Sequence, residues 1–529
     1  MAAATADRVV VVGAGIGGLV AALELALRGL DVTLLEAADG PGGKMRALNV
    51  GGQRIDAGPT VFTMRWVFDR ILAEAGTTLE ALVDLQPLDT LARHAWRGHG
   101  PTLDLHADAA RSAEAIARFA SPAEARRFSA FCAESRRVYR RLEGPHIRSS
   151  RPSLGRMVAD LGPRGLAELS ALGPFASLWR TLGRHFHDPR LRQLFARYAT
   201  YCGASPWLAP ATLMLVAHVE QEGVWSITGG MDMLAQRLAA LAAVRGVRLR
   251  YGAAVQRIEL RGGAVAAVHL LGGERLAADH VVFNGDADAL AQGLLGPDLP
   301  SRLPPPLPAA KRSLSALTWV MTAHARGLPL ARHNVFFDDD YASEFDDVFR
   351  RRRLPRRGTV YVCAQDRLDG HGAAPAGAER LLVLVNAPAD GDRASLSDLE
   401  MDRCTERMQE LLQACRLTLE PSSPAAVQRR GPTEFARLFP GSGGALYGPA
   451  THGWMALFRR AGAATAVPGL FLAGGSVHPG PGVPMAAMSG SLAAATLMAH
   501  RDSTSRSRRV RISGGTSTPS ATTVAMRSR

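Results

Sequence analysis

The first forty residues contain three apolar segments with different patterns. Residues 8–12 are a short valine-rich run, which is typical of a parallel strand buried on both faces. Residues 19–28 consist almost entirely of strong helix formers, and the following Gly29 is a suitable helix C-cap. Residues 31–36 form a second strand-like run. This order predicts a β-α-β unit with the glycine-rich residues 13–18 at the turn into its helix.

The rest of the chain divides into helical and strand-like stretches. Between residues 107 and 222 the apolar positions recur with helical spacing, and we expect the many aromatic residues there to form a helix core. Residues 303–309 are proline-rich and predict a connector, and the Ser/Thr/Arg-rich residues 501–529 predict a disordered tail. The predicted later strands are residues 247–251, 255–258, 264–268, 280–284, 313–323, 381–385 and 469–473, and the predicted last helix is residues 484–500.

Length and composition indicate a multidomain globular protein. The chain has 529 residues, of which 47% are hydrophobic and 21% charged, and these proportions exclude wholesale disorder. No apolar run reaches the roughly 18 residues of a membrane-spanning helix, and the N-terminus lacks the pattern of a signal peptide. The five cysteines contain no C-x-x-C pair, which argues against a disulfide scaffold and a zinc site. We expect a cytoplasmic protein without a bound metal.

The formal net charge of +14 comes almost entirely from arginine, because Lys44 and Lys311 are the only lysines. Two interpretations remain open, namely the coding bias of a GC-rich genome and attraction to an anionic partner. Nucleic acid is not expected as that partner, because no nucleic-acid-binding motif accompanies the charge. The basic cluster at residues 350–357 follows the acidic residues 338–347, which can neutralise it, and a second cluster lies in the tail.

The glycine-rich turn carries the signature of a dinucleotide-binding site. Gly13, Gly15 and Gly18 form G-x-G-x-x-G between the predicted strand and helix, and Gly17 lies in the same turn. Gly13 permits a tight turn, Gly15 lets the backbone approach a pyrophosphate, and Gly18 permits close helix–strand packing. The amides and the positive dipole of the helix N-terminus then bind the phosphates. Glu36 ends the next strand, at the place of a ribose-binding carboxylate.

A second glycine turn, Pro41-Gly-Gly-Lys-Met-Arg46, follows shortly, and residues 56–60 read Asp-Ala-Gly-Pro-Thr. Together with the first turn, these segments resemble the FAD domain of the flavin amine oxidase and carotenoid desaturase superfamily. A cofactor that extends across the domain would use both segments, whereas a plain nicotinamide-binding domain needs no second turn. The resemblance implies FAD as the cofactor, with its ribityl and flavin portions near Gly43, Lys44, Gly58, Pro59 and Thr60.

The resemblance covers most of the chain and is strongest to bacterial enzymes of the phytoene desaturase type. In the family, amides at the start of the last helix face the pyrimidine end of the isoalloxazine, where a helix N-terminus stabilises negative charge. Ser476 stands where many relatives have aspartate, and it can hydrogen-bond but carries no charge. The segments that carry the resemblance are residues 186–195, 198–206, 223–231, 333–337, 345–349 and 474–485. The further FAD contacts that it implies are Val255, Gly475, Val483, Pro484 and Met485.

Residues 444–448 and 452–454 most resemble the branch that desaturates hydroxylated or methoxylated acyclic carotenoids. This resemblance implies C3–C4 desaturation of a 1-hydroxy or 1-methoxy carotenoid by hydride transfer to FAD. No acid–base or nucleophilic constellation stands out, so no catalytic side chain is assigned and His478 is interpreted as structural. Because such a substrate has almost no polar group, we expect a long apolar channel. The electron acceptor is not indicated, and residues 452–454 are the first place to look for recognition of the terminal oxygen.

Three alternative functions remain open. A phytoene desaturase would introduce several double bonds. A flavin amine oxidase would share the N-terminal motifs and commonly places a lysine near flavin N5, for which only Lys311 is available in the second domain. A prenyl-lipid-binding protein on the same scaffold would carry no flavin and would be colourless.

The predicted fold is α/β, with a Rossmann-like FAD-binding domain, a discontinuous substrate domain and a helical cap. Because a carotenoid partitions into lipid, we expect peripheral association with the inner or photosynthetic membrane. The tail holds seven arginines and one aspartate, and it either contributes to this association or has no function. The FAD-binding parts are residues 1–100, 226–300 and 441–500; the cap is residues 101–225, the substrate domain residues 301–440, and the tail residues 501–529.

Overall fold

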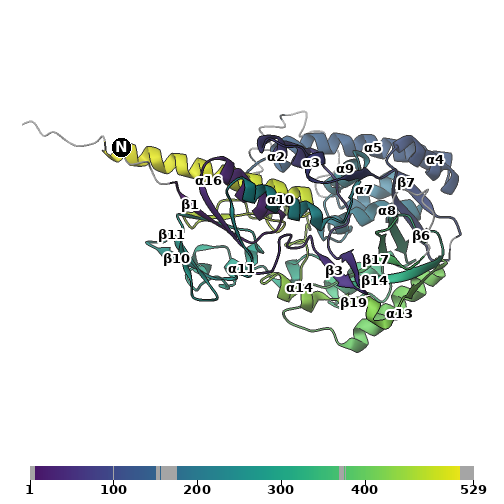
Figure 1. Ribbon diagram of the computed structural model, residues 1–529. Helices are drawn as coiled ribbons and strands as arrows, with labels where there is room; N and C mark the ends of the chain where they lie inside the picture. Colours follow the sequence, from purple (N-terminus) through teal and green to yellow (C-terminus); the bar gives the residue numbers. More distant parts are fainter. Residues whose placement is uncertain are drawn as a thin grey trace, which may run out of the picture.

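A computed structural model shows two sheets side by side with helices covering them (Figure 1). The structure describes residues 6–98, 100–150, 155, 162, 176–367, 375 and 377–512, with side chains to residue 504. Within these residues, no helix is both long enough and apolar enough to span a membrane.

The first sheet is parallel and has the strand order β20-β13-β1-β2-β9. Its centre is the predicted β-α-β unit, in which β1 and β2 pair in parallel on either side of helix α1. The outer strands come from segments more than 200 residues away in sequence, so the sheet joins three distant parts of the chain. The bounds are β1 Arg8–Val12, α1 Ile16–Leu27, β2 Asp31–Leu35, β9 Arg248–Arg250, β13 His280–Phe283 and β20 Leu470–Leu472.

Different layers cover the two faces of this sheet. On one face α1 packs against α10 (Asp232–Val244) and α16 (Val483–Ile512), and their apolar residues form one buried cluster with Val9, Val11 and Val32. On the other face lies a small antiparallel sheet, visible below α16 in Figure 1. Its strands are β10 Val255–Arg261, β11 Ala264–Leu270 and β12 Arg275–Ala277.

The prediction of a disordered tail is wrong for its first part, because α16 continues to Ile512. No glycine or proline occurs between residues 501 and 512, so nothing in the sequence stops the helix there. Arg501 Nε also lies 2.7 Å from Asp7 Oδ2 and ties this part of the helix to the N-terminus. Residues 513–529 of the predicted tail lie outside the described residues.

The second sheet has the order β18-β14-β17-β16-β15-β6-β7, with β19 also paired to β14. The predicted boundary at residue 100 differs from this arrangement, because β6 pairs in parallel with β15 and therefore belongs to the second sheet. A strand's partner is decided by distant residues, so the local pattern did not indicate this position. The bounds are β6 Thr90–Trp96, β7 Leu103–His106, β14 Ser315–Gly327, β15 His333–Phe337, β16 Val360–Ala364, β17 Glu379–Ala387, β18 Leu417–Pro421 and β19 Val427–Arg430.

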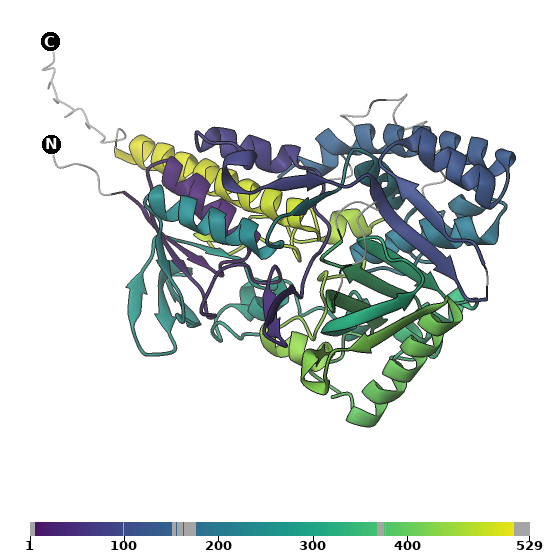
Figure 2. The ribbon, with the colours of Figure 1, turned by 45° about the vertical axis from the view of Figure 1, so that its right-hand side comes forward.

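A helical cap lies over one face of the second sheet, and α13 (Asp398–Ala414) covers the other (Figure 2). The expected aromatic helix core is present: Phe186 and Phe195 stack with ring centroids 4.7 Å apart, and Phe131 contacts both. The cap helices are α4 Ala109–Phe119, α5 Pro122–Leu142, η1 Glu143–Ile147, α7 Leu178–His185, α8 Pro189–Ala196, η2 Arg197–Cys202, η3 Ala211–Met214 and α9 Leu215–Gln221.

Short elements connect these layers. They are β3 Ala47–Val50, β4 Gln53–Asp56, α2 Trp66–Glu74, α3 Leu79–Leu82, β5 Leu85–Pro87, β8 Trp225–Ile227, α11 Ala287–Ala291, η4 Pro300–Arg302, η5 Ala309–Lys311, α12 Tyr341–Phe345, η6 Asp346–Arg350, η7 Pro424–Ala426, α14 Pro432–Leu438 and α15 Ala456–Arg459.

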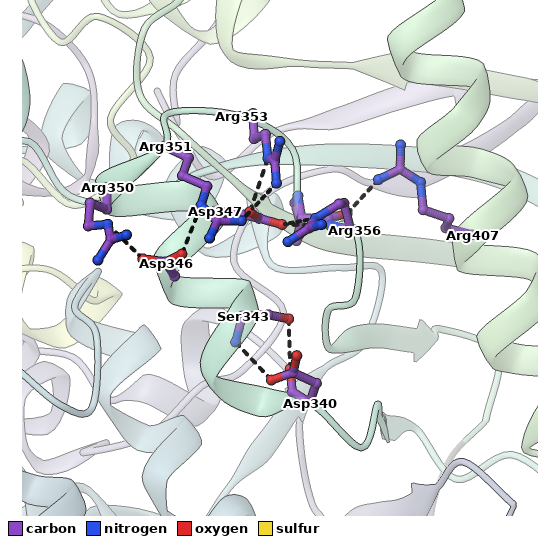
Figure 3. Close-up of polar contacts among 10 residues, drawn as sticks. Asp340, Ser343, Asp346, Asp347, Arg350, Arg351, Arg353, Arg356 and Arg407 are labelled. Carbon is purple, nitrogen blue, oxygen red and sulfur yellow. Dashed lines mark hydrogen bonds and ion pairs between the residues drawn. The ribbon is translucent and has the colours of Figure 1, made fainter.

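The charge of the basic cluster at residues 350–357 is neutralised by nearby carboxylates of the chain, as the sequence predicted. Arg353 and Arg356 contact the carboxylate of Asp347, and Arg350 pairs with Asp346 (Figure 3). Burial alone would raise the pKa of Asp347, but the backbone amide of Arg356 and the guanidinium groups hold it below its usual value. This cluster is therefore part of the folded structure rather than a free cationic surface.

Candidate cofactor and substrate site

The glycine loop between β1 and α1 has a geometry that only glycine allows. Gly13 has φ +100°, and a Cβ at Gly18 would lie 2.1 Å from the carbonyl oxygen of Gly13. Gly15 is the N-cap of α1 and offers no side chain to the amides of the first turn. These amides lie at the carboxyl end of a parallel strand, which is where a pyrophosphate binds in such folds.

Glu36 lies beside this loop at the end of β2. Its Oε2 accepts a hydrogen bond from the backbone amide of Ala14 at 2.7 Å, and its Oε1 accepts one from Ala38 at 2.9 Å. The carbonyl oxygen of Glu36 accepts a bond from the amide of Ala253, two residues before Val255. Half-buried Val255 packs against the cluster that contains Leu35, so both predicted residues lie at the same edge of the sheet.

The second glycine turn packs directly on the first. The amide of Gly42 donates to the carbonyl of Ala14 at 2.9 Å, and a Cβ at Gly43 would lie 3.2 Å from the Cα of Gly15. A Cβ at Gly58 would in turn lie 2.0 Å from the carbonyl oxygen of Lys44. The structure therefore brings the three predicted segments into contact, in the order that an extended cofactor requires.

Lys44 links this turn to the C-terminal part of the chain. Its Nζ donates to the carbonyl of Leu446 at 2.7 Å and lies 5.1 Å from the ring centre of Phe439. Burial lowers the pKa of Lys44, although the carboxylate of Asp286 opposes this effect. Lys44 thus holds residue 446 and does not project freely into solvent.

The predicted C-terminal residues surround the start of α16. Gly474 donates its amide to Ser489 Oγ at 3.2 Å, and Ser476 Oγ accepts from the amide of Ala287 at 3.1 Å. A Cβ at Gly17 would lie 2.8 Å from the carbonyl of Ala486, so the first turns of α1 and α16 meet. The first residues of α16 are Val483 and Pro484, which are buried, and Met485, which is half-buried; Gly475 precedes them.

His478 is held in this loop by contacts of its ring. Its Nε2 donates to the carbonyl of His146 at 2.9 Å, and the two rings meet edge to face. Burial lowers the pKa of His478 to about 4, so the ring is uncharged near neutral pH.

Two residues that organise the site were not predicted from the sequence. Asn284 Nδ2 donates to the carbonyl of Gly13 at 3.2 Å, and the only local signal was a polar residue at the end of a strand. Arg460 Nη1 donates to the carbonyls of Tyr447 and Gly475, and its Nη2 donates to the carbonyl of Pro449. Nothing distinguishes Arg460 in an arginine-rich sequence, because its role depends on two loops that meet only in the folded chain.

An internal chamber adjoins these loops beneath the helical cap. Tyr201, Tyr361 and Tyr447 lie deep in the protein, where desolvation raises the pKa of each hydroxyl. Each of them, and Arg197 beside them, nevertheless keeps accessible surface. Side chains that lie deep in the protein and remain partly accessible are typical of a cavity wall, and from this we infer a chamber for a ligand.

The other candidate residues near the chamber have different roles. His452 Nε2 accepts from the amide of Ser205 at 2.9 Å, its ring contacts Phe349, and burial lowers its pKa to about 4. Trp454 is 39% exposed at the surface. The side chain of Lys311 is exposed as well, which does not suit a lysine that must contact a buried flavin.

The residues present fit a dinucleotide with an extended second half. The loop at Gly13–Gly18 leaves no space for side chains, its helix amides carry no cap, and a carboxylate lies at the adjoining strand end. The glycine turn at residues 42–43 and the segment at Gly58 continue the same surface, and Thr60 in that segment contacts the hydroxyl of Tyr361. Such a site suits a ligand with a pyrophosphate, a ribose and a ring system.

Comparisons with known proteins agree with this geometry. The family model described as flavin containing amine oxidoreductase matches residues 16–498. Two hydroxyneurosporene desaturases are similar: that of Rubrivivax gelatinosus is 64% identical over 98% of each chain, and that of Cereibacter sphaeroides is 46% identical over 95% of this chain and 99% of its own. A zeta-carotene-forming phytoene desaturase of Myxococcus xanthus is 33% identical over 93% and 94%.

Among solved structures, putrescine oxidase bound to putrescine matches with a TM-score of 0.58 and 15% identity, covering 93% of this chain and 99% of its own. This likeness shows the same fold. A dinucleotide-binding loop in a flavin-dependent family means FAD, which is the cofactor of this protein. The chain belongs to the family of flavin-containing amine oxidoreductases.

Proposed function

We propose that the protein desaturates an acyclic carotenoid, introducing the C3–C4 double bond at a 1-hydroxy or 1-methoxy end. The observation that carries this proposal is 64% identity along 98% of a hydroxyneurosporene desaturase. The phytoene desaturase relative is much less similar, at 33%, which favours a single 3,4-desaturation over the introduction of several double bonds. The exposed position of Lys311 argues against amine oxidation.

The proposed FAD contacts follow the line of segments described above. Bound FAD supplies a two-electron oxidant that accepts a hydride from a C–H bond of the substrate. The chain holds the pyrophosphate on the uncapped amides of α1, and it holds the ribose through Glu36. The residues assigned to FAD are Gly13, Gly15, Gly17, Gly18, Glu36, Gly43, Lys44, Gly58, Pro59, Thr60, Val255, Gly475, Val483, Pro484 and Met485.

The chamber contributes position and exclusion of water rather than acid–base chemistry. Burial keeps the tyrosines of the chamber protonated, since it raises the pKa of Tyr361 and Tyr447. Burial also lowers the pKa of His333 to about 3, so this ring is neutral. A largely desolvated chamber whose tyrosines and histidine are uncharged suits a polyene, which must lie with its reacting C–H about 3–3.5 Å from the acceptor atom.

We also propose that the protein takes its substrate from the cytoplasmic surface of a membrane, on which it lies peripherally. Leu208 and Trp454 support this, since they are 51% and 39% exposed and their segments meet through a hydrogen bond between Gly453 and Leu208. The arginine-rich segment from residue 501 adds positive charge that attracts anionic lipid.

The experiment that tests the function is turnover of a panel of acyclic carotenoids by the purified yellow protein. We expect 1-hydroxyneurosporene to be converted, with a red shift of its absorption from the longer conjugated system. Phytoene should react roughly ten- to a hundredfold more slowly, because its hydrocarbon end leaves the polar groups of an oxygen-binding site without a hydrogen-bond partner. Equal turnover of both substrates would contradict the 3,4-specific proposal.

A further inference from the structure

One polar patch interrupts the chamber under the helical cap. It consists of Thr60, Arg197, Tyr201, His333 and Tyr361, and we call it the oxygen-binding patch. Arg197 and Tyr201 belong to η2 in the cap, whereas His333 and Tyr361 belong to neighbouring strands of the second sheet. The patch therefore lies where the cap meets the sheet.

The hydroxyl of Tyr361 is the centre of the patch. It lies 2.7 Å from Thr60 Oγ1 and 2.7 Å from His333 Nδ1, and the rings of His333 and Tyr361 are stacked. The tyrosine is therefore fixed from two sides. Its ring also forms one wall of the space occupied by the guanidinium of Arg197.

Two residues of the patch have polar atoms that the hydrogen bonds and ion pairs of the described residues leave partly or wholly unused: the guanidinium of Arg197, and Nε2 of His333, which is buried without a partner. The guanidinium carbon of Arg197 lies 5.3 Å from the ring centre of Tyr361 and 5.8 Å from that of Tyr201. Within the described part of the chain, no carboxylate forms an ion pair with it. Glu344, an acidic neighbour, uses Oε2 for Thr359 and Oε1 for Asn386.

An interior arginine needs acceptors, because its five N–H groups are donors only and burial without partners is costly. Two aromatic faces satisfy part of the charge, and the hydroxyl of Tyr201 interacts with the guanidinium, but these contacts leave most of its five N–H groups without an acceptor. A polyene supplies no acceptor, whereas a hydroxyl or methoxyl oxygen does. The patch thus matches the only polar atom that the proposed substrate carries near its reacting end.

The patch also lies on the line that the FAD segments follow. Gly42 and Gly43 contact the first glycine loop, and Gly58 packs on Lys44. Thr60 is two residues after Gly58 and contacts Tyr361 directly. In a 1-hydroxycarotenoid the oxygen-bearing carbon is only two bonds from C3, so a group that binds this oxygen must lie close to the reacting position.

We propose that Arg197, set between Tyr201 and Tyr361, binds the C1 oxygen of the carotenoid and thereby fixes which C–H bonds reach the flavin. This inference rests on the proposed function and names the residues behind its specificity. Because arginine only donates hydrogen bonds, it can bind the oxygen of either a hydroxyl or a methoxyl group, whereas a hydrocarbon end offers it no acceptor and is disfavoured. His452, the first residue of the 452–454 segment in which recognition of this oxygen was expected, is already engaged with Ser205.

The test compares Arg197→Met with the wild type and with Arg197→Lys. Arg197→Met should lower kcat/KM for 1-hydroxyneurosporene ten- to a hundredfold and leave that for neurosporene within about twofold. Arg197→Lys keeps a charge and a donor and should recover part of the loss. Equilibrium binding of the hydroxylated carotenoid to the reduced holoprotein, measured by its absorption shift, should weaken in the same order.

Arg192→Met is the matched control. Arg192 also lies over an aromatic ring, 3.9 Å from the centre of Trp179, but it lines an outer cavity. We expect its substrate preference and flavin content to equal those of the wild type. If wild-type protein does not convert 1-hydroxyneurosporene, the proposed function fails. If it does, and Arg197→Met with full flavin content keeps the same preference and binding, the assignment of Arg197 alone is overturned.

Discussion

Asn284 Nδ2 donates a hydrogen bond to the carbonyl oxygen of Gly13 over 3.2 Å, joining residues that are 271 positions apart. The same side chain fills the space next to Gly15, Gly17 and Gly474, where an added Cβ would lie 2.7–2.9 Å from its amide atoms. The glycine loop, the end of β13 and the start of the C-terminal loop are therefore packed around one amide.

Replacing Asn284 should weaken cofactor binding. Asn284→Leu removes the donor to Gly13 and sets a branched apolar group against three glycines, so the loop must shift. We expect the FAD dissociation constant to rise at least tenfold, as measured by flavin release on dilution. Asn49→Leu changes an exposed strand residue and should leave flavin content unchanged. Full FAD affinity in Asn284→Leu would show that the loop does not depend on this contact.

A side chain at Gly15 should abolish the yellow chromophore. Its Cβ would lie 2.9 Å from Asn284 Nδ2, and the branches of Gly15→Val would occupy the path of the pyrophosphate. Gly40→Val is the control, because a Cβ at Gly40 meets nothing within 4 Å and its φ is not positive. Flavin absorbance per protein should be near zero for the first variant and normal for the second. Normal flavin content in Gly15→Val would refute the position of the cofactor.

The local parts of this architecture could be predicted from sequence. Residues 8–36 contain their own strand, turn and helix signals, so the β-α-β unit and Glu36 at its edge followed from spacing alone. Asn284, Arg460 and Arg197 could not be identified in this way. Their roles come from contacts between segments that meet only after folding, and neither a polar strand end nor one more arginine marks such a contact.

Two wrong expectations have the same origin. The position of β6 depends on its pairing with β15, more than 200 residues later, so a boundary drawn at residue 100 assigned it to the wrong sheet. The helix beyond residue 500 is polar in composition, and composition alone suggested disorder. The segment is helical because the preceding, largely buried turns of α16 run into it without a break, and an existing helix extends more easily than a new one forms.

The crossing of α1 and α16 should not tolerate a side chain at Gly490. An added Cβ would lie 2.2 Å from the carbonyl oxygen of Gly17, and backbone cannot give way as a flexible side chain can. Gly490→Val should reduce the free energy of unfolding by about 1–3 kcal/mol in urea titrations. Ala495→Val, on the exposed side of α16, should change it by less than about 0.5 kcal/mol. Equal stability of the two variants would contradict this close crossing.

Acid should destabilise the folded chain through His478. Burial lowers its pKa to about 4, while the unfolded chain titrates near 6.5, so between these values only the unfolded state binds the proton. The free energy of unfolding therefore falls as the pH decreases through this window, by up to about 1.4 kcal/mol per pH unit from this group. His478→Gln should show a shallower dependence in urea titrations, and exposed His324→Gln an unchanged one. A slope in His478→Gln as steep as that of the wild type would exclude this residue as a contributor.

Removal of the C-terminal arginines should weaken attraction to anionic membranes. Residues 501–529 carry seven arginines and one aspartate, and each basic residue near an anionic surface contributes about 1 kcal/mol when engaged. Truncation after His500 should reduce binding to anionic liposomes, most strongly at low salt, where screening is weakest. Truncation after Ile512 is the matched control, because it keeps five of these arginines and should keep most of the binding. Binding to uncharged liposomes should be the same for all three chains, since it depends on apolar contacts such as those of Leu208 and Trp454. If the chain that ends at His500 binds anionic liposomes as well as the full chain at low salt, the tail has no part in membrane association.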